Sequence, residues 1–465
     1  MRTDYVPHSP DDVAAMLVAV GVRDVEDLFD EIPDEVRLKR PLDLGPGICE
    51  SEASAALQHL AGRNTPASRM VSFLGAGVYD HYVPACVDAI VSRSELTTAY
   101  TPYQPERSQG LLQSIFEFQT VICELTGLDV SNASMYDGGT ALAEAAMLAS
   151  AQTRRGTIVV SDGVHPEYRQ VVNTETAGLE LRSRVVPLNE SAATDIQSGA
   201  QVVGPETAAV VIQQPNFFGT LEDVRAFAEI AHAAGALLIV VADPLSLGML
   251  EAPGALGADI VVGEAQSLGN PMSFGGPGLG FMAVAGSLTR RMPGRLVGQT
   301  RDNAGRRGFV LTLQTREQHI RRQKATSNIC SNHALNALAA VIYLGWLGRE
   351  GLPELGMLCA RKAAYLRRRL LELPGVQAFT AGPVLREFAV RLPMPAARMV
   401  DALLPLGVLA GVPASRFRDQ FTGLASQDLD SILLVAVTEK RTKADMDALV
   451  AALGAELTGT EATHG

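Results

Sequence analysis

The chain has 465 residues, a length that favours two or three domains over a single small core. Apolar residues make up 47% and charged residues 19% of the sequence, which is typical of a large globular enzyme and excludes wholesale disorder. The formal net charge of −12 repels the phosphates of nucleic acids, so we expect no nucleic acid among the partners.

The opening residues, MRTDYVPHSPDD, lack the basic stretch and apolar run of a signal peptide. The sequence also lacks an apolar run of about 18 residues that would cross a bilayer, so we expect a cytoplasmic protein with no membrane partner. The cysteines lie far apart and form no CxxC pair, which favours reduced, mostly buried thiols over a disulfide framework or a metal site. These cysteines are Cys49, Cys86, Cys123, Cys330 and Cys359.

Residues 1–65 are predicted to form a helical arm. In SPDDVAAMLVAVG, Ser9 is a suitable N-cap, Pro10 suits the first helical position, and acidic residues follow in the first turn. VRDVEDLFDEIP repeats this pattern over a shorter stretch. Neither helix can bury much surface alone, so we expect the arm to lie across another surface.

Residues 66–315 are predicted to form a large α/β domain. Short apolar runs rich in Val and Ile alternate with Ala-rich helical stretches such as LEDVRAFAEIAHAAG. Because these runs are continuous, they indicate strands buried on both faces of a largely parallel sheet, and ligands of such sheets bind beyond the carboxyl ends of the strands. The predicted strands are GTIVVSD (156–162), AAVVIQQP (208–215), ALLIVVADP (236–244), ADIVVGEA (258–265) and LGFMAVA (279–285).

Residues 316–465 are predicted to hold a linker helix and a smaller α+β domain. A Lys/Arg-rich segment over 315–333 leads into NHALNALAAVIYLGWLG, which has the composition of a long buried helix. The predicted elements that follow are helix RKAAYLRRRLLEL, strands REFAVRLP and SILLVAVT, and the closing helix TKADMDALVAALG.

DGGTALAEAAMLAS, over residues 137–150, is a glycine turn that enters a strong helix. Free N–H groups at a helix start bind phosphate well, and Gly138 and Gly139 would let the backbone approach it closely. Thr140 could add a hydroxyl group. The alternative is a capped helix start with no ligand.

Two further residues follow predicted strands. His165, in VSDGVHPEY, could lie over a flat cofactor, or it could be a structural histidine that only makes hydrogen bonds. Asp243, in VVADPLSLG, ends the most apolar strand, and a buried carboxylate there needs a partner. In pyridoxal-phosphate (PLP) enzymes that partner is the protonated ring nitrogen. The alternative is that Asp243 only caps a turn.

The phosphate helix, the stacking residue and the aspartate follow the order of fold-type I PLP enzymes. Such an enzyme next needs a lysine in the loop after the following strand, but ADIVVGEAQSLGNPMSFGGPGLGF contains none. A Schiff base needs a primary amine, which no other side chain supplies. The chain has no lysine between Lys39 and Lys324, and Lys324 is a poor candidate because it belongs to a different segment.

Long, non-repetitive segments connect the chain to a known family. They are ELTTAYTPYQPERSQGLLQ (95–113), MYDGGTALAEAAMLA (135–149), FGGPGLGFMA (274–283), MPGRLVGQT (292–300) and LTLQTREQHIRRQKATSNIC (311–330). Through them the chain resembles the α subunit (subunit 1) of two-subunit glycine dehydrogenase (decarboxylating), the P-protein of the glycine cleavage system. The resemblance covers nearly the whole length.

The resemblance implies the fold of a fold-type I, aspartate-aminotransferase-like PLP-dependent transferase. In the family's β subunit a His-Lys-Thr triplet precedes a proline and a run of glycines. Counting back from Pro271 and the shared GGPG places Gln266 at the lysine position. The cofactor-site positions would then be relics, and they are Gly138, Gly139, Thr140, His165 and Asp243.

The resemblance also implies partners and a reaction. The β subunit would hold the PLP, and an active site would form where α meets β in an α2β2 assembly. Glycine would lose carbon dioxide there, and its aminomethyl group would pass to the oxidised lipoyl arm of the H-protein. This chain would complete the pocket and hold the β subunit in its active shape.

Tyrosine can hydrogen-bond and also bound an apolar pocket, which suits a site for a small zwitterion. The predicted wall of the shared active site consists of Tyr100, Thr101, Pro102 and Tyr103. The alternative is that these residues only pack at the subunit interface. Three basic residues, Arg316, Arg321 and Arg322, could hold an anionic partner, or they could form a solvated or interface face.

Two other functions remain open. One is a self-sufficient PLP enzyme of the same fold that uses Lys324. The other is a degenerate fold that has become a ligand-binding or regulatory protein with no catalytic partner.

Overall fold

The computed structural model describes residues 7–97, 100–325 and 327–461. The chain divides into two compact units, Met1–Thr65 and Pro66–Gly465. No described helix is long and apolar enough to cross a membrane. The predicted boundary at residue 316 stays a prediction.

The N-terminal unit contains helices α1 (Pro10–Val20) and α2 (Glu50–Ala61) and a short 3-10 helix (Val25–Phe29). The Ser9 hydroxyl accepts a hydrogen bond from the Asp12 N–H at 3.2 Å, and the Asp12 carboxylate accepts one from the Ser9 N–H at 2.7 Å. This reciprocal pair is a capping box, so the predicted start of the first helix is confirmed.

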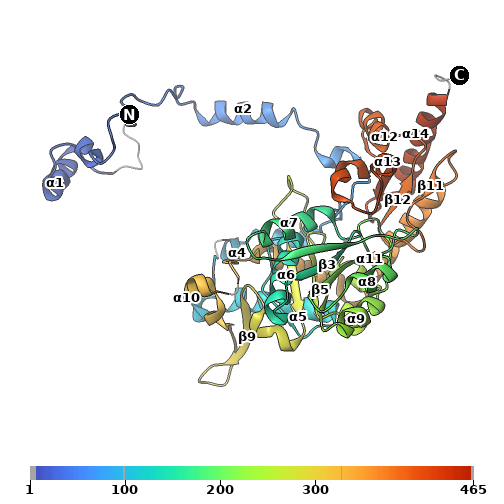
Figure 1. Ribbon diagram of the computed structural model, residues 1–465. Helices are drawn as coiled ribbons and strands as arrows, with labels where there is room; N and C mark the ends of the chain where they lie inside the picture. The colour runs from blue at the N-terminus through green and yellow to red at the C-terminus, as the bar shows by residue number, and fades with distance from the viewer. Residues whose placement is uncertain (1–6, 98–99, 326, 462–465) are drawn as a thin grey trace. The chain divides into compact units, whose positions relative to one another are not determined.

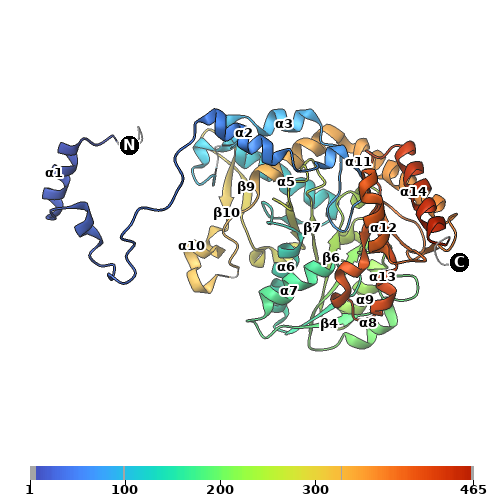
Figure 2. The ribbon, with the colours of Figure 1, turned by 90° about the horizontal axis from the view of Figure 1, so that it is seen from above.

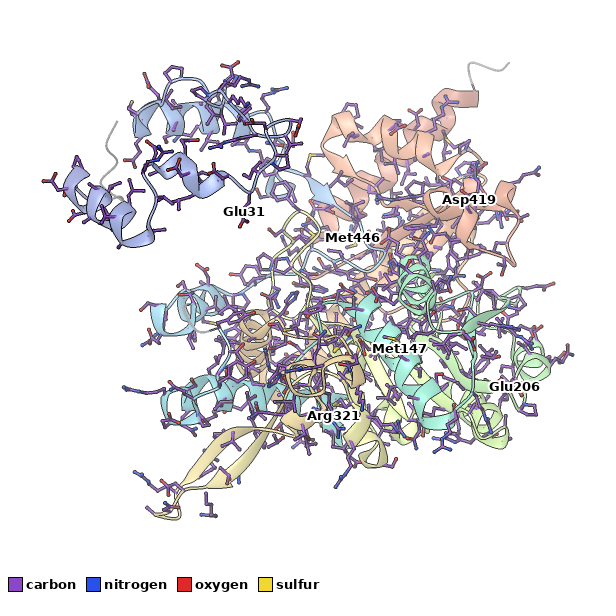
Figure 3. All side chains as sticks on the ribbon, turned by 60° about the vertical axis from the view of Figure 1, so that its left-hand side comes forward. Glu31, Met147, Glu206, Arg321, Asp419 and Met446 are labelled. Atoms are coloured by element: carbon purple, nitrogen blue, oxygen red, sulfur yellow. The ribbon has the colours of Figure 1, made fainter. Side chains whose placement is uncertain are left out.

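The side chains of the N-terminal unit have no core of their own. No residue in 7–65 is buried, and Figure 3 shows these side chains standing out around their own helices. Exposed large apolar residues in the unit are Met16, Val18, Val20, Val25, Leu28, Phe29, Ile32, Val36, Leu38, Leu42, Leu44, Ile48, Leu57 and Leu60. So many exposed apolar side chains are typical of a segment that packs against another surface.

A seven-stranded sheet forms the centre of the second unit, in the order β2-β8-β7-β6-β5-β3-β4. The five strands from β3 to β7 pair in parallel, and β8 and β2 close one edge in antiparallel pairs. The strands are β2 (Val130–Ser131), β3 (Thr157–Ser161), β4 (Arg182–Val186), β5 (Thr207–Gln214), β6 (Leu237–Ala242), β7 (Ile260–Glu264) and β8 (Gly280–Val284).

Helices cover both faces of this sheet, as Figure 1 shows around β3 and β5. Residues on one face, such as Val159 and Val210, pack against α5, α9 and α11, whereas Val211 and Ile239 on the other face pack against α6 and α7. Successive strand residues point to opposite faces, which explains the continuous apolar runs. The covering helices are α5 (Gln109–Thr126), α6 (Gly138–Thr153), α7 (Pro166–Thr176), α8 (Ile196–Val202), α9 (Val224–Ala233) and α11 (Ala334–Leu370).

A smaller lobe at the C-terminal end contains a four-stranded antiparallel sheet in the order β11-β12-β15-β14. Its strands are β11 (Gln377–Ala378), β12 (Glu387–Arg391), β14 (Val412–Pro413) and β15 (Ile432–Ala436). Its helices are α12 (Ala396–Leu403), α13 (Ser426–Asp430) and α14 (Lys443–Glu461), and Figures 1 and 2 show α12 and α14 side by side. An early segment joins this lobe, because β1 (Val71–Ser72) pairs in parallel with β13 (Val408–Leu409).

The remaining elements carry three of the marker segments. A hairpin of β9 (Leu296–Arg301) and β10 (Arg307–Thr312) leads into the short helix α10 (Gln318–Arg321). Two short helices, α3 (Ala85–Val91) and α4 (Ser94–Thr97), precede the YTPY segment.

The predicted fold class is confirmed, and the five predicted strands of the large sheet correspond to β3, β5, β6, β7 and β8. The two predicted long helices form one element, α11, with a break at Gly348, where φ is +67°. The prediction that the thiols are mostly buried is wrong. All five cysteines are free, but only Cys359 is buried, and Cys49 and Cys330 are exposed.

Candidate functional site

The carboxyl edge of the large sheet brings the predicted cofactor positions together. His165 follows β3, Asp243 follows β6, and α6 starts beside the end of β7. Two cavities that share His165 and Glu264 among their lining residues lie here, with volumes of about 60 and 540 Å³. Asp243 lines the smaller cavity, and Gln266 lines the larger one.

At the start of α6, carboxylates already bind the backbone N–H groups that a phosphate would need. The Thr140 N–H donates to Asp137 Oδ1 at 2.8 Å, and the Gly138 N–H donates to Glu264 Oε2 at 3.1 Å. The Thr140 hydroxyl donates to the Asp137 carbonyl at 3.1 Å. The N–H groups of Gly138 and Thr140 and the Thr140 hydroxyl therefore have partners within the chain.

His165 stacks on a side chain of its own chain. Its ring lies 4.6 Å from the Tyr168 ring, centroid to centroid, with 21° between the planes. Its Nε2–H donates to the Ala76 carbonyl at 2.9 Å, and its Nδ1 accepts from the Glu167 N–H at 3.2 Å. Burial lowers the pKa of His165, which agrees with this neutral tautomer.

Asp243 pairs with Arg386, which directly precedes β12. Arg386 Nη2 lies 2.5 Å from Asp243 Oδ2, and the Arg386 side chain is only 4% exposed. The guanidinium carbon also lies 3.4 Å from the centroid of the Tyr79 ring. A guanidinium keeps its charge in proteins, so the buried Arg386 supplies a positive charge beside the half-buried carboxylate of Asp243.

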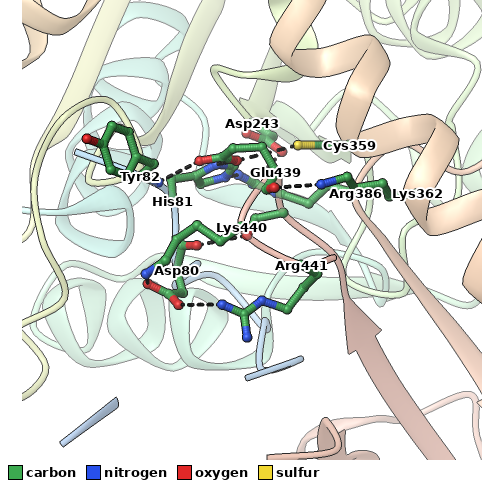
Figure 4. Close-up of polar contacts among 11 residues, drawn as sticks. Asp80, His81, Tyr82, Asp243, Cys359, Lys362, Arg386, Glu439, Lys440 and Arg441 are labelled. Carbon is green, nitrogen blue, oxygen red and sulfur yellow. Dashed lines mark hydrogen bonds and ion pairs between the residues drawn. The ribbon is translucent and has the colours of Figure 1, made fainter. Parts of the chain in front are cut away.

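Figure 4 shows that Arg386 also belongs to a second cluster of polar side chains. Arg386 Nη1 lies 2.6 Å from His81 Nε2, and His81 Nδ1 lies 2.7 Å from Glu439 Oε2. Because a guanidinium only donates, His81 Nε2 must accept, and the His81 proton is on Nδ1 and donates to Glu439. Cys359 completes the cluster, with its Sγ 3.8 Å from the same Glu439 oxygen.

His81, Cys359 and Glu439 are the residue types that bind metals, and their ligand atoms lie within 4.8 Å of one another. The chemistry of the cluster disfavours an ion. The proton on His81 Nδ1 lies where the ion would bind, and burial raises the pKa of the Cys359 thiol to about 12, so no thiolate is available near neutral pH.

Gln266, the residue at the predicted Schiff-base position, is 6% exposed. Its Nε2 donates to the Asn270 carbonyl at 2.5 Å, whereas its Oε1 has no partner. None of the described residues that line the two cavities is a lysine. Lys324 is exposed, in a short 3-10 helix (Arg322–Lys324) after α10.

The YTPY segment lies apart from this cavity, against the marker segment 311–330. The Tyr103 ring contacts the His319 ring edge to face at 6.1 Å, and the Arg295 guanidinium lies 5.8 Å from its centroid. Tyr100 and Tyr103 are 79% and 52% exposed. Pro102 is buried, and the buried Thr101 hydroxyl has no partner. Residues 98–99 and 326 of these two markers lie outside the described residues.

The three basic residues of the marker segment 311–330 have different surroundings. Arg316 donates to the carbonyls of Met292 and Gly294, the latter at 2.9 Å, so its guanidinium holds the backbone in place. Arg321 (Figure 3) is exposed and donates to the Thr315 carbonyl at 3.0 Å, and Arg322 is also exposed. An anionic partner at Arg321 and Arg322 stays a prediction.

The sequence interpretation missed three residues of the site: Tyr168, Glu264 and Arg386. Glu264 could have been found, since it ends a predicted buried strand as Asp243 does. Tyr168 lies three residues after His165 on α7, a spacing at which helical side chains meet. Nothing near Arg386 in the sequence connects it with Asp243, which is 143 residues away.

The residues at this edge do not fit PLP. Asp243, the predicted partner of the ring nitrogen, already pairs with Arg386, and the Gly138 N–H of the predicted phosphate turn already donates to Glu264. Tyr168 lies against the stacking histidine. Three carboxylates line the larger cavity (Asp137, Glu167 and Glu264), whereas neither Lys nor Arg is among its described lining residues.

The sheet order, the helices on both faces and the arrangement at the carboxyl edge define the fold of the fold-type I PLP-dependent enzymes. Solved structures with this architecture include a glutamate decarboxylase from Lactobacillus brevis, with a TM-score of 0.69 and 14% identity over 92% of this chain and 96% of that one. A NifS-like protein has a TM-score of 0.63 at 12% identity, over 84% and 99% of the two chains. These likenesses concern the fold alone.

The model of the glycine cleavage system P-protein family matches residues 3–453, and the chain belongs to that family. A protein of Carboxydothermus hydrogenoformans named probable glycine dehydrogenase (decarboxylating) subunit 1 is 52% identical, over 97% of this chain and 99% of that protein. The protein with the same name from Geobacillus kaustophilus is 50% identical, over 97% and 98%. A crystal structure of glycine decarboxylase (P-protein) in inhibitor-bound form has a TM-score of 0.87 and 47% identity, over 97% of this chain and 99% of that one.

Replacement of Arg386 by leucine tests the buried ion pair. R386L leaves the Asp243 charge without its partner, so we expect it to lower the free energy of unfolding by about 3–5 kcal/mol. In the double variant D243N/R386L no charge is left unpaired, and much of the loss should be recovered. Urea unfolding of the wild type, both single variants and the double variant measures the coupling. Additive effects would show that the pair is not coupled.

Glu144 on α6 predicts a pH dependence of stability. Burial raises its pKa from 4.5 to about 7, although the Ser327 hydroxyl donates to its Oε1 at 2.8 Å. The folded state therefore retains a proton that the unfolded chain has lost, and stability falls as pH rises from about 4.5 to 7. We expect E144Q to gain about 1–3 kcal/mol over the wild type at pH 8 and little at pH 4.5.

Urea unfolding across this pH range measures the difference, with the exposed Glu229 on α9 as the matched position. E229Q should follow the wild-type profile. A constant offset between E144Q and the wild type at every pH would contradict the assignment to Glu144.

Proposed function

We propose that this chain is the α subunit of a glycine decarboxylase and does not itself hold PLP. With the β subunit it would decarboxylate glycine and pass the aminomethyl group to the lipoyl arm of the H-protein. In that transfer a bond forms between the aminomethyl carbon and one lipoyl sulfur, and the lipoyl disulfide is reduced. The part of this chain is to complete the active site and to stabilise the β subunit.

The observation that carries the proposal is that the side chains of Asp243 and His165, predicted to contact a cofactor, already have partners within the chain. Asp243 pairs with Arg386, His165 stacks on Tyr168, and Gln266, at the predicted lysine position, donates to the Asn270 carbonyl. PLP supplies an electron sink for the electrons left when carbon dioxide departs, and it would do so in the partner subunit. The exposed apolar side chains of the N-terminal unit agree with a large obligate interface.

A self-sufficient enzyme is the second candidate function, and the position of Lys324 does not favour it. The Lys324 side chain is exposed and lines neither cavity at the carboxyl edge, where Asp243 and His165 lie. A Schiff-base lysine needs to reach the same pocket as those two residues.

Purification of the chain alone, followed by mixing with the β subunit, tests the assignment. With added PLP, we expect the chain alone to show no visible Schiff-base absorption, and glycine decarboxylation to appear only in the mixture. Trapping with borohydride, followed by peptide mapping, identifies the lysine that carries the cofactor. Label at Lys324 of this chain, or activity without the β subunit, would contradict the proposal.

We further propose that Tyr100, Thr101, Pro102 and Tyr103 form a wall of the active site shared with the β subunit. Two observations support this role: the exposure of both tyrosine rings, and the contacts of Tyr103 with His319 and Arg295. An aromatic ring fixed from behind by a buried arginine presents a rigid surface outward.

Replacement of Tyr103 by alanine separates a wall of the active site from simple interface packing. In the assembled enzyme we expect Y103A to lower kcat/KM for glycine by about tenfold to a hundredfold, equivalent to about 1.4–2.7 kcal/mol, while the subunits still associate. Steady-state kinetics and analytical ultracentrifugation measure the two effects. The control is L179A, which removes an exposed apolar side chain just after α7. Loss of association with unchanged kinetics of the remaining complex would favour packing alone.

A further inference from the structure

The carboxylate of Glu264 lies in a cradle of backbone N–H groups. Its Oε1 accepts from the N–H groups of Leu279 at 2.6 Å and Gln266 at 2.9 Å. Its Oε2 accepts from the Gly138 N–H at the start of α6, at 3.1 Å. This combination of donors with the positive end of a helix dipole is the usual surrounding of a bound phosphate.

The side chain of Tyr168 also covers the turn at the start of α6. A Cβ atom on Gly138 would lie 2.6 Å from the Tyr168 hydroxyl, so Tyr168 packs directly against the bare backbone. Glycine is thus needed at this position for contact with a side chain of the chain itself. The sequence pattern that predicts a phosphate turn is satisfied here without a phosphate.

The carboxylates of the larger cavity add an electrostatic exclusion of phosphate to the steric one. A helix start carries about half a positive charge, and together with three backbone N–H donors it stabilises the charged form of Glu264, although burial raises the pKa of this carboxyl group. Asp137 and Glu167 line the same cavity, and neither Lys nor Arg is among its described lining residues. An incoming phosphate would therefore meet net negative charge at the place where the fold otherwise attracts anions.

We propose that Glu264 is the specificity-determining residue that keeps a phosphate-bearing cofactor out of this chain, because its carboxylate substitutes for the phosphate at the start of α6. The inference rests on the proposed function, in which PLP belongs to the partner subunit. It adds the residue that enforces this distribution. The lost lysine removes the covalent bond to the cofactor, and Glu264 removes the phosphate anchor.

The variant E264Q tests the charge with the least disturbance. Its amide oxygen can still accept from Leu279 and Gln266, but the negative charge beside the Gly138 N–H is gone. The matched control is E167Q, which removes one negative charge from the same cavity without touching the start of α6. Both are made in the full chain, and circular dichroism establishes that they fold.

Isothermal titration with inorganic phosphate, without PLP, is the direct measurement. We expect E264Q to bind phosphate at least tenfold more tightly than the wild type, and E167Q to bind like the wild type. Competition between phosphate and PLP for E264Q then shows that the site is the phosphate end of the cofactor pocket. If E264Q loses its fold, E264A is measured in the same way.

An E264Q or E264A chain that folds but binds phosphate no better than the wild type would overturn the inference. An equal gain in E167Q would do so too, because general charge and not this contact would then be responsible. A wild-type chain that retains PLP in equimolar amount after dialysis would overturn the proposed function and this inference together, whereas a failed phosphate titration leaves the proposed function untouched. The two failures therefore give different results.

Discussion

The ion pair between Asp243 and Arg386 is the contact on which the site at the carboxyl edge depends. A carboxylate at the end of a buried strand is unfavourable unless a positive charge lies beside it. In a fold-type I enzyme a bound cofactor supplies that charge. Here Arg386 supplies it from 2.5 Å away, within the same chain. The charge of Asp243 is therefore balanced within the chain.

The same pair holds the two lobes of the second unit together. Asp243 follows β6 of the large sheet, whereas Arg386 precedes β12 of the small sheet. The next residue, Glu387, accepts from the Tyr79 hydroxyl at 2.6 Å, and burial raises the pKa of Glu387. His81 and Glu439 extend the chain of contacts on the other side of Arg386 (Figure 4). Separation of the lobes would break several buried polar contacts at once, so the closed arrangement is strongly favoured.

The sequence predicts the large sheet well because its signal is local. Runs such as 156–162 and 236–244 are apolar throughout, since both faces of each strand are covered, and the predicted residues after them meet because parallel strands end at one edge. Strand β4 was not predicted, since its first three residues, RSR, are exposed and charged or polar. Arg386 could not be predicted either, because only closure of the lobes brings it to Asp243. The contact of the YTPY segment with His319 could not be predicted for the same reason, because it joins distant parts of the chain.

The residues predicted to contact a cofactor have partners within the chain, and these partners give the sequence pattern a second explanation. Each has a structural reason for its residue type: Asp243 balances Arg386, His165 packs on Tyr168, and Gly138 makes room for the Tyr168 hydroxyl. A pattern that predicts a cofactor site can thus be explained by contacts within the fold. By the same argument, an exposed residue that contacts within the chain do not explain is a candidate for a functional role. The Tyr100 side chain is 79% exposed, so packing within the described part of the chain does not account for it, and a partner surface that covers it would supply the missing reason.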